Sequence, residues 1–370
     1  MKGRPELRTS YESDQAPLGT PAKRFWFGAF LVALLVLPFG LTSELNALMA
    51  TAFISAIGAI GLNIVTGYAG QVSLGHAFFL GLGAYTAAVL SGPTDRNVVG
   101  FGLDMWIWLP AAGLLPAIVG FIVAPVAARL KGLYLAIVTL GLVFLGEHLF
   151  REMVFVTGGV GTGRSAAKLE MFGTRIDQRT EIGSYTITRE MKLYFVGFIV
   201  LLVMAVLAKN LTRSKVGRAF SAVRDRDIAA EVMGVELTRH KVIAFAVSSF
   251  YAGICGALLS TLTGFIEPGS YGLLQSVNFL AMILIGGVAT LSGSLMGAAF
   301  VVLLPRLVQE IPRFLPFIEG GSTGGFITTF QLETLLFGAG IVAFMILEPR
   351  GLFGMWVRGR TYWKAWPFSY

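Results

Sequence analysis

Residues 67–85 read GYAGQVSLGHAFFLGLGAY and interrupt a long apolar run. The stretch lies within Leu45–Thr94, fifty residues that contain no Asp, Glu, Lys or Arg. A membrane-crossing helix needs about 20 apolar residues, so this run is long enough for two. Gly67, Gly70 and Gly75, with several polar side chains, stand between the two halves. The run therefore predicts two helices separated by a break.

The composition of the whole chain excludes an ordinary soluble protein. Of its 370 residues 55% are hydrophobic and 14% are charged, and the mean hydropathy is +0.73. Soluble domains carry about 25% charged residues. The fold class predicted is all-α, a polytopic integral membrane bundle of about ten transmembrane helices with a helical loop on the cytoplasmic side. The predicted spans are 25–43, 47–66, 74–91, 106–127, 131–149, 193–208, 242–263, 276–291, 293–309 and 332–348.

The basic residues, which give the chain a net charge of +8, lie mostly between the spans. Cytoplasmic loops carry an excess of Lys and Arg, which places the polar leader 1–24 inside and predicts that its neighbouring apolar run is a retained span. If the ten predicted spans of the transmembrane domain 25–348 cross the membrane in turn from an inside N-terminus, the loop 209–241 and the basic aromatic tail 349–370 lie inside. The loop 150–192 falls outside although it too is basic. The tail's Trp and Tyr residues are typical of a segment at the lipid headgroups. A disordered tail is the alternative.

Small residues at helical spacing predict close helix packing within the membrane. Gly293 and Gly297 form a Gly-x-x-x-Gly pair, and Ala252 and Gly256 form a second small pair. Such positions let two helix backbones approach each other. Packing is therefore the expected role of most glycines in the spans.

Two interpretations of the break at 67–75 remain open. Irregular backbone survives at membrane depth only where protein or water surrounds it, and the next helix would present N–H groups and a positive dipole end to a carboxylate or carbonyl. The alternative is a tight turn whose polar side chains face the cytoplasm. The residues of the candidate translocation path are Asn63, Gln71, Ser73, His76 and Asn278. The competing role for Asn63 and Asn278 is a hydrogen bond between helices.

Catalytic, cofactor and metal motifs are weak in this sequence. Gly158–Ser165 reads GGVGTGRS, which has the spacing of a phosphate-binding loop, but Arg164 replaces the Lys and no strand–helix pattern surrounds it. The three histidines are scattered, and Cys255 is the one cysteine. The sequence therefore predicts no catalytic, metal or cofactor site in this chain, and a flexible external loop at 150–192.

The inside loop SKVGRAFSAVRDRDIAAEVMGVELTRHK, residues 214–241, carries the richest pattern. Small apolar residues recur at helical spacing around the charged Arg224–Asp227 run, which predicts short amphipathic helices. Such a structured loop suggests a docking surface. A helix lying flat on the bilayer is the alternative, although a narrow, alanine-rich face would bind lipid weakly.

Several segments resemble the branched-chain amino-acid ABC transporter permease family of the LivM type. IAAEVMG (228–234) is similar to the Glu-Ala-Ala-x-x-x-Gly coupling motif of ABC importer permeases: Ala229, Ala230 and Gly234 match, whereas Ile228 stands where Glu is usual. Further resemblance lies in GLNIVTGYAGQVSLGHAFFLGLGAYTA (61–87), LKGLYLAIVTLG (130–141), GRAFSAVRDRDIAAEVMGV (217–235), NFLAMILIGGVATLSGSLMGAAF (278–300) and LEPRGLFGMW (347–356).

The resemblance implies a subunit of an ATP-driven importer in the bacterial cell membrane. It implies a second, LivH-like permease subunit, two cytoplasmic ATPase subunits that bind the ATP, and an extracytoplasmic substrate-binding protein. Nucleic acid is not an expected partner. The expected ATPase-coupling interface comprises Arg218, Arg224, Asp225, Asp227, Ala229, Ala230, Glu231 and Gly234.

The cargo and mode of transport keep alternatives open. The expected cargo is branched-chain or other hydrophobic amino acids, and members of the same family are expected to import urea, amides or small organic acids. A stand-alone secondary transporter or channel is a second class, which the near absence of acidic residues in the spans disfavours. An intramembrane enzyme is a third class, and no catalytic cluster supports it.

Overall fold

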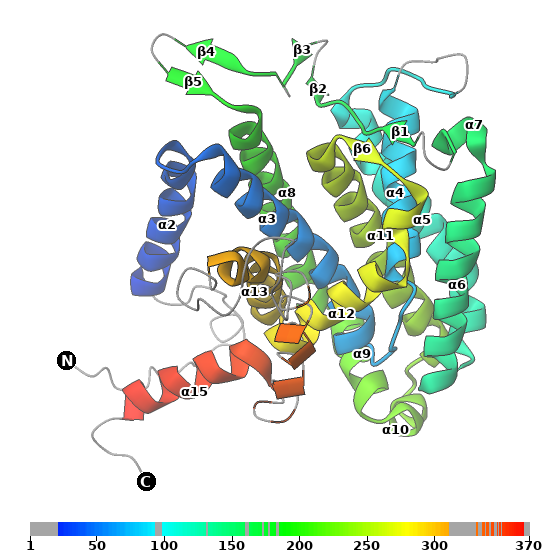
Figure 1. The fold of residues 1–370 in the computed structure, drawn as a ribbon. Coiled ribbons are helices and arrows are strands. Elements are labelled where there is room, and N and C mark those ends of the chain that lie inside the picture. Colours follow the sequence, from blue (N-terminus) through cyan, green and yellow to red (C-terminus); the bar gives the residue numbers. More distant parts are fainter. Residues whose placement is uncertain are drawn as a thin grey trace.

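The computed structural model is a bundle of helices with short β ladders gathered at one end (Figure 1). The structure describes residues 21–310 except 93–97, 131, 160–162, 172, 173, 177, 183 and 184, then scattered residues between 331 and 350, and residues 351–365. The leader 1–24 falls almost wholly outside these described residues. The predicted span 332–348 lies largely outside them as well.

The helices follow the apolar runs of the sequence. In chain order they are α2 (Pro21–Val36), η1 (Leu37–Phe39), α3 (Ser43–Asn63), η2 (Ile64–Tyr68), α4 (His76–Ser91), α5 (Met105–Ala128), α6 (Leu133–Glu152), α7 (Val154–Thr157), α8 (Arg189–Arg213), α9 (Lys215–Asp225), α10 (Asp227–Val232), α11 (Leu237–Thr263), η3 (Pro268–Tyr271), α12 (Leu273–Gly286), α13 (Leu291–Glu310) and α15 (Gly351–Ala365). The predicted polytopic helical membrane fold is confirmed.

The helices differ in length more than the sequence predicted. Among the residues that the structure describes, five helices are long and apolar enough to cross a membrane: α3 continued through η2, α5, α6, α8 and α11. Four shorter apolar helices lie at Arg24–Phe39, α4, α12 and Leu291–Leu307. With 14 residues, α12 rises about 21 Å at about 1.5 Å per residue, less than the ~30 Å of a bilayer core. The expectation that each predicted span crosses by itself is therefore wrong for α12.

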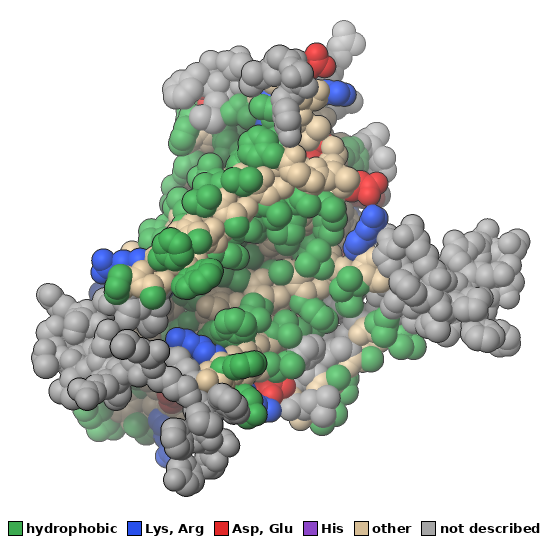
Figure 2. Space-filling view, turned by 90° about the vertical axis from the view of Figure 1, so that its left-hand side faces the viewer, with side chains coloured by type: hydrophobic (Ala, Val, Ile, Leu, Met, Phe, Trp, Pro, Cys, Tyr) green, Lys and Arg blue, Asp and Glu red, His purple; other side chains and the backbone are tan. Residues whose placement is uncertain are grey.

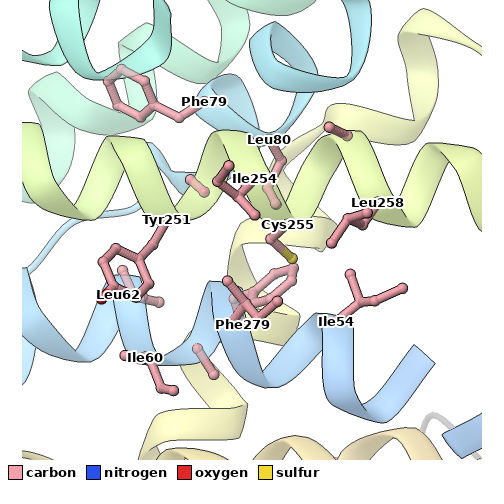
Figure 3. Close-up of a cluster of buried hydrophobic side chains, with 14 of the residues drawn as sticks. Ile54, Ile60, Leu62, Phe79, Leu80, Tyr251, Ile254, Cys255, Leu258 and Phe279 are labelled. Carbon is pink, nitrogen blue, oxygen red and sulfur yellow. The ribbon is translucent and has the colours of Figure 1, made fainter. Parts of the chain in front are cut away.

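Helix α11 lies at the centre of the bundle and packs against α3, α4 and α5. Figure 3 shows Cys255 of α11 between Leu80 of α4 and Ile54 of α3, with Phe279 of α12 closing the cluster. These apolar side chains are almost fully buried. The core of the molecule is thus built where helices distant in sequence meet.

Glycines permit the closest helix contacts, as the small pairs predicted. A Cβ on Gly256 would overlap the Leu80 carbonyl of α4, and one on Gly253 would overlap the Ala112 carbonyl of α5. In the hairpin of α12 and α13, Gly297 lies against Met282 in the same way. Backbone-to-backbone approach replaces the hydrophobic effect as a source of helix association in lipid.

The outside of the bundle is apolar. Figure 2 shows hydrophobic side chains covering most of the described surface on one flank, with charged side chains mainly toward its edges. Large exposed apolar side chains also cover α5, for example Ile118 and Ile122. Continuous apolar surface of this extent marks contact with a membrane or a partner protein.

The segment between α6 and α8, predicted as a flexible loop, is folded onto one end of the bundle. It contains β1 (Arg164–Ser165), β2 (Glu170–Met171), β3 (Thr174–Arg175), β4 (Thr180–Ile182) and β5 (Tyr185–Ile187). These strands form antiparallel pairs β2–β3 and β4–β5, and β1 pairs with β6 (Phe265–Ile266), which follows α11.

Arg164 fastens this segment to the bundle. Its guanidinium donates to the carbonyls of Val156, Ala88 and Val99, at 2.7, 2.9 and 2.6 Å. Burial lowers the pKa of this guanidinium from its usual value, while the neighbouring Tyr85 raises it. Arg164 therefore ties three chain segments together, which leaves it unlike the lysine of a phosphate-binding loop.

The basic segments gather at the opposite end from the strands. The Lys241 Nζ lies 3.5 Å from the Ala128 carbonyl at the end of α5, so the turn after α5 is beside the start of α11. Gly351, at the start of α15, packs against the backbone of Ile285 and Gly287 (φ of Gly351 +64°). From there α15 extends sideways from the bundle (Figure 1). Trp356, Tyr362 and Trp363 of α15 are exposed. The location of the tail at the lipid headgroups stays a prediction.

Candidate functional site

The break predicted after residue 66 begins with a change in helix type. The last turn of the first helix, η2 (Ile64–Tyr68), is a wider π-helical turn, and residues 69–75 are not helical. Gly70 has a φ of +69°, a backbone conformation that L side chains rarely adopt. Such π turns occur often at functional sites. The chain re-enters a helix at His76, so the break is a short irregular segment in which Gln71 and Ser73 are buried while Gly70 and Val72 are exposed.

Polar side chains of the break bond to neighbouring backbone. The Thr66 hydroxyl donates to the Gln71 carbonyl at 3.1 Å, and the Gln71 Nε2 donates to the Lys241 carbonyl at 3.2 Å. The backbone N–H of Gln71 donates to the Val65 carbonyl. The bonds to the Gln71 N–H and carbonyl satisfy backbone groups that the end of the helix leaves without partners, and the bond to Lys241 ties the break to α11.

The start of α4 is less open to a ligand than the sequence suggested. The Leu74 N–H donates to the Thr139 hydroxyl at 3.0 Å, and the Ala77 N–H donates to the Ser276 hydroxyl at 2.9 Å. Thr139 and Ser276 come from α6 and α12. Two of the N–H groups expected to face substrate are therefore used to hold helices together.

Asn63 connects the break to the hairpin of α12 and α13. Its Nδ2 donates to the Thr290 carbonyl at 2.9 Å and to the Ser294 hydroxyl at 2.7 Å, while its Oδ1 accepts from the Ala289 N–H at 2.8 Å. Ala289 has a φ of +59°, so these bonds stabilise an unusual loop conformation. This is the role between helices that the sequence offered as the alternative for Asn63.

The other residues of the candidate path differ in their surroundings. Ser73 and His76 are buried, and the Ser73 hydroxyl accepts from the Gly75 N–H at 3.3 Å. The His76 ring lies against Phe279, with ring centroids 5.0 Å apart. Asn278, on α12, is half-buried. The structure gathers four of the five residues around the break, but it buries them rather than lining an open path.

The loop predicted to carry amphipathic helices contains α9 and α10. The Ser214 hydroxyl accepts from the Gly217 N–H at 3.3 Å and caps α9. Arg226 is extended and separates the two helices, and Gly234, with a φ of +85°, follows α10. Phe220, Val223 and Ala230 are buried beneath them. The two helices are therefore packed onto the bundle end rather than tethered to it.

The exposed face of α10 is apolar, and the sequence interpretation missed it. Ile228, Val232 and Met233 are 73%, 81% and 83% exposed. We call these three residues the α10 apolar face. The spacing of four between Ile228 and Val232 is a helical signal, and Met233 directly follows α10, but the sequence alone did not show which side of α10 the bundle covers.

The residues expected at the ATPase-facing surface divide into two groups. The exposed group, as an interface before docking requires, comprises Arg218, Asp225, Ala229, Glu231 and Gly234, with Asp227 half-buried beside it. Ala230 is 5% exposed and cannot belong to that surface. Arg224 turns toward the break, where its Nη1 donates to the Gly67 carbonyl at 3.1 Å and its Nε to Asp225 Oδ1 at 2.9 Å.

A cavity of about 250 Å³ lies beside the contact between the break and the segment 214–234, which carries α9 and α10 and is called the coupling segment after its expected role. It is bordered by Gln71 and Gly70 of the break, by Arg224, Asp225, Arg226 and Asp227 of the coupling segment, and by Lys241. Among the residues that the structure describes, no group of three or more His, Cys, Asp or Glu side chains is placed to hold a metal ion. The site thus consists of an irregular segment between two helices and of the surface helices α9 and α10, which touch it through Arg224.

A broken helix within a polytopic apolar bundle, with a structured helical loop packed beside the break, is the architecture of a membrane transport subunit. Residues 45–346 match the family described as branched-chain amino acid transport system, permease component. The chain belongs to this family, and it is a multi-pass protein of the cell membrane.

The chain is similar to curated permeases of enterobacteria. It is 31% identical over 343 residues to the high-affinity branched-chain amino acid transport system permease protein LivM of Salmonella typhimurium, covering 88% of this chain and 75% of that protein. The LivM protein of Escherichia coli gives the same values. LivH of Escherichia coli is 25% identical over 254 residues, which cover 65% of this chain and 77% of LivH. No solved structure matches the chain.

Proposed function

We propose that this chain is the transmembrane permease subunit of an ATP-driven ABC importer for branched-chain or other hydrophobic amino acids. Membership in the permease family, with 31% identity to LivM over 88% of the chain, is the observation that carries the proposal. The names of the relatives LivM and LivH, each the permease protein of a branched-chain amino acid transport system, support the choice of cargo.

The subunit works in a complex that divides binding, transport and energy supply. A second, LivH-like permease completes the translocation path. Two ATPase subunits bind ATP at the cytoplasmic side, and this chain holds no cofactor of its own. An extracytoplasmic binding protein delivers the substrate at the end that carries the β ladders.

The α10 apolar face is the contact for one ATPase. Three large apolar side chains that are this exposed on a six-residue helix suit the desolvated centre of a protein interface. The neighbouring charges of Arg218 and Glu231 suit its polar rim. ATP binding and hydrolysis then move α9 and α10, which are packed tightly enough to pass that motion to the spans.

The test is a double substitution, Val232→Asp with Met233→Asp, in the complete complex. Buried interface anchors typically contribute about 2 kcal/mol or more each, so the variant should lose ATPase copurification and ATP-driven uptake of labelled leucine in proteoliposomes. Val154→Asp, at the opposite end of the molecule and also exposed, is the matched control and should retain both. A double variant that still copurifies with the ATPase contradicts the docking role.

Two other functions give different results in the same assay. A stand-alone secondary transporter or channel takes up substrate as the single chain, without ATP and driven by an ion gradient. An importer of urea, amides or small organic acids depends on ATP, but leucine does not compete with its uptake. The first outcome refutes the importer, and the second changes only its cargo.

A further inference from the structure

Arg224 forms a hydrogen bond between the coupling segment and the helix break. Arg224, at the end of α9, donates from Nη1 to the Gly67 carbonyl at 3.1 Å. Its Nε is held by Asp225 Oδ1 at 2.9 Å, and the Arg224 side chain is 34% exposed. A guanidinium offers several donors in a rigid planar group. Arg224 can therefore hold a carbonyl of the break while it remains fixed to its own loop.

The Gly67 carbonyl is available because the helix ends there. The next N–H groups pair with earlier carbonyls: Ala69 donates to Ile64, and Gln71 donates to Val65. Buried carbonyls need a partner, and Arg224 supplies one from outside the helix. The hydrogen-bonding state of the break thus depends on the position of the coupling segment.

The packing around this bond leaves little room for independent movement. A Cβ on Gly70 would lie 2.8 Å from the Arg224 Cγ, and Gly70 itself has a φ of +69°. A Cβ on Gly67 would overlap the Asn63 side chain and lie 2.5 Å from the Ala289 nitrogen. The break is therefore in direct contact with Arg224 on one side and with the α12–α13 loop on the other.

Asn63 extends the connection from the break into the α12–α13 hairpin through its bonds to Ala289, Thr290 and Ser294. A displacement of α9 has a continuous path of hydrogen bonds and close contacts through residues 63–70 to this hairpin. Coupling between distant parts of a protein requires such an element, with an equilibrium that both parts bias.

We propose that Arg224 is a positioning residue of transport: it transmits the movement of α9 and α10 to the broken helix by holding the Gly67 carbonyl. When the ATPases displace α9, the Arg224–Gly67 bond moves the break and, through Asn63, the α12–α13 hairpin. This inference rests on the proposed importer function. It assigns Arg224 an inward role that differs from the docking contact expected from the sequence.

The test uses Arg224→Ala in the complete complex reconstituted in proteoliposomes, with leucine uptake and ATP hydrolysis measured on the same sample. The variant should keep ATPase copurification and hydrolysis. The amount of leucine imported per ATP should fall by about tenfold, within the range of coupling between two protein sites. Arg224→Lys keeps a cationic donor and should restore much of this ratio. A merely structural role of Arg224 would not predict this rescue.

Arg226→Ala is the matched control, because Arg226 borders the same cavity and lies two positions along the same segment. It should keep the import-to-hydrolysis ratio of the unmodified complex. A normal ratio in Arg224→Ala overturns the inference and leaves the importer function intact. Loss of ATPase copurification in Arg224→Ala also overturns it, because Arg224 is then a docking residue. An unmodified complex that takes up leucine without ATP refutes the proposed function itself.

Discussion

Asn63 is fully buried near the end of α3 and makes three hydrogen bonds to the hairpin of α12 and α13. Its amide both donates to and accepts from the loop backbone there. The bond from the Ala289 N–H to the Asn63 Oδ1 stabilises the φ of +59° at Ala289. A single polar side chain thus determines how two apolar helices meet.

Asn63→Ala should destabilise the protein by about 1–3 kcal/mol, because the Ala289 N–H and the Thr290 carbonyl lose their side-chain partner in a buried place. The melting temperature of the purified protein in detergent measures this loss. Asn210→Ala, an exposed asparagine at the end of α8, is the matched control and should be neutral. Equal melting temperatures for the two variants would contradict the structural role of Asn63.

The sequence predicted the helices of the coupling segment, but it did not predict which of their side chains face the bundle. The pattern around 214–241 predicted helices and a docking surface, and the family resemblance assigned Arg224, Ala230 and their neighbours to that surface. The structure turns Arg224 to the break and buries Ala230. A six-residue helix has fewer than two turns, so its spacing does not reveal which side faces the bundle.

At the scale of elements, small residues determine how closely α11 approaches its neighbours. Gly253 faces the backbone of α5, where a Cβ would overlap the Ala112 carbonyl and lie 2.7 Å from the Pro116 Cγ. The same helix packs against α4 through Gly83 and Gly256. The predicted apolar run was sufficient for a helix, and the glycines determine its partners.

Gly253→Ala should cost about 1–3 kcal/mol, because overpacking forces two helix backbones apart. Gly141→Ala, in α6, is the control: nothing lies within 4 Å of the added Cβ. Removing a glycine from an open helix position should stabilise the helix by about 0.5–1 kcal/mol. Melting curves in detergent compare the two variants, and a Gly253→Ala protein as stable as Gly141→Ala would contradict the close approach.

At the scale of the molecule, the segments outside the membrane-spanning helices gather at two opposite ends of the bundle. The β ladders and Arg164 lie at one end, while α9, α10 and the turn after α5 lie at the other (Figure 1). The basic loops of the predicted inner side are at the second end. Which end faces the cytoplasm is a prediction from charge.

Cysteine labelling in intact cells tests that prediction. In a Cys255→Ala background, Thr238→Cys at the start of α11 and Gln178→Cys among the β ladders each place one thiol at an exposed position. A membrane-impermeant reagent should label Gln178→Cys in intact cells and Thr238→Cys only after permeabilisation. The unmodified protein, whose Cys255 is buried, should stay unlabelled in a parallel sample. The reverse pattern would remove the coupling segment from the ATPase side.

The amino-acid sequence by itself determined the class of protein, because helices in a bilayer need long charge-free runs and such runs are visible without a structure. It also located the break, since Gly67, Gly70 and Gly75 interrupt the run locally. Tertiary structure alone decided that Arg224 bonds to the break, that Gln71 bonds to α11, and that Asn63 bonds to the α12–α13 hairpin. Those outcomes depend on contacts between residues more than a hundred positions apart, which local periodicity does not encode.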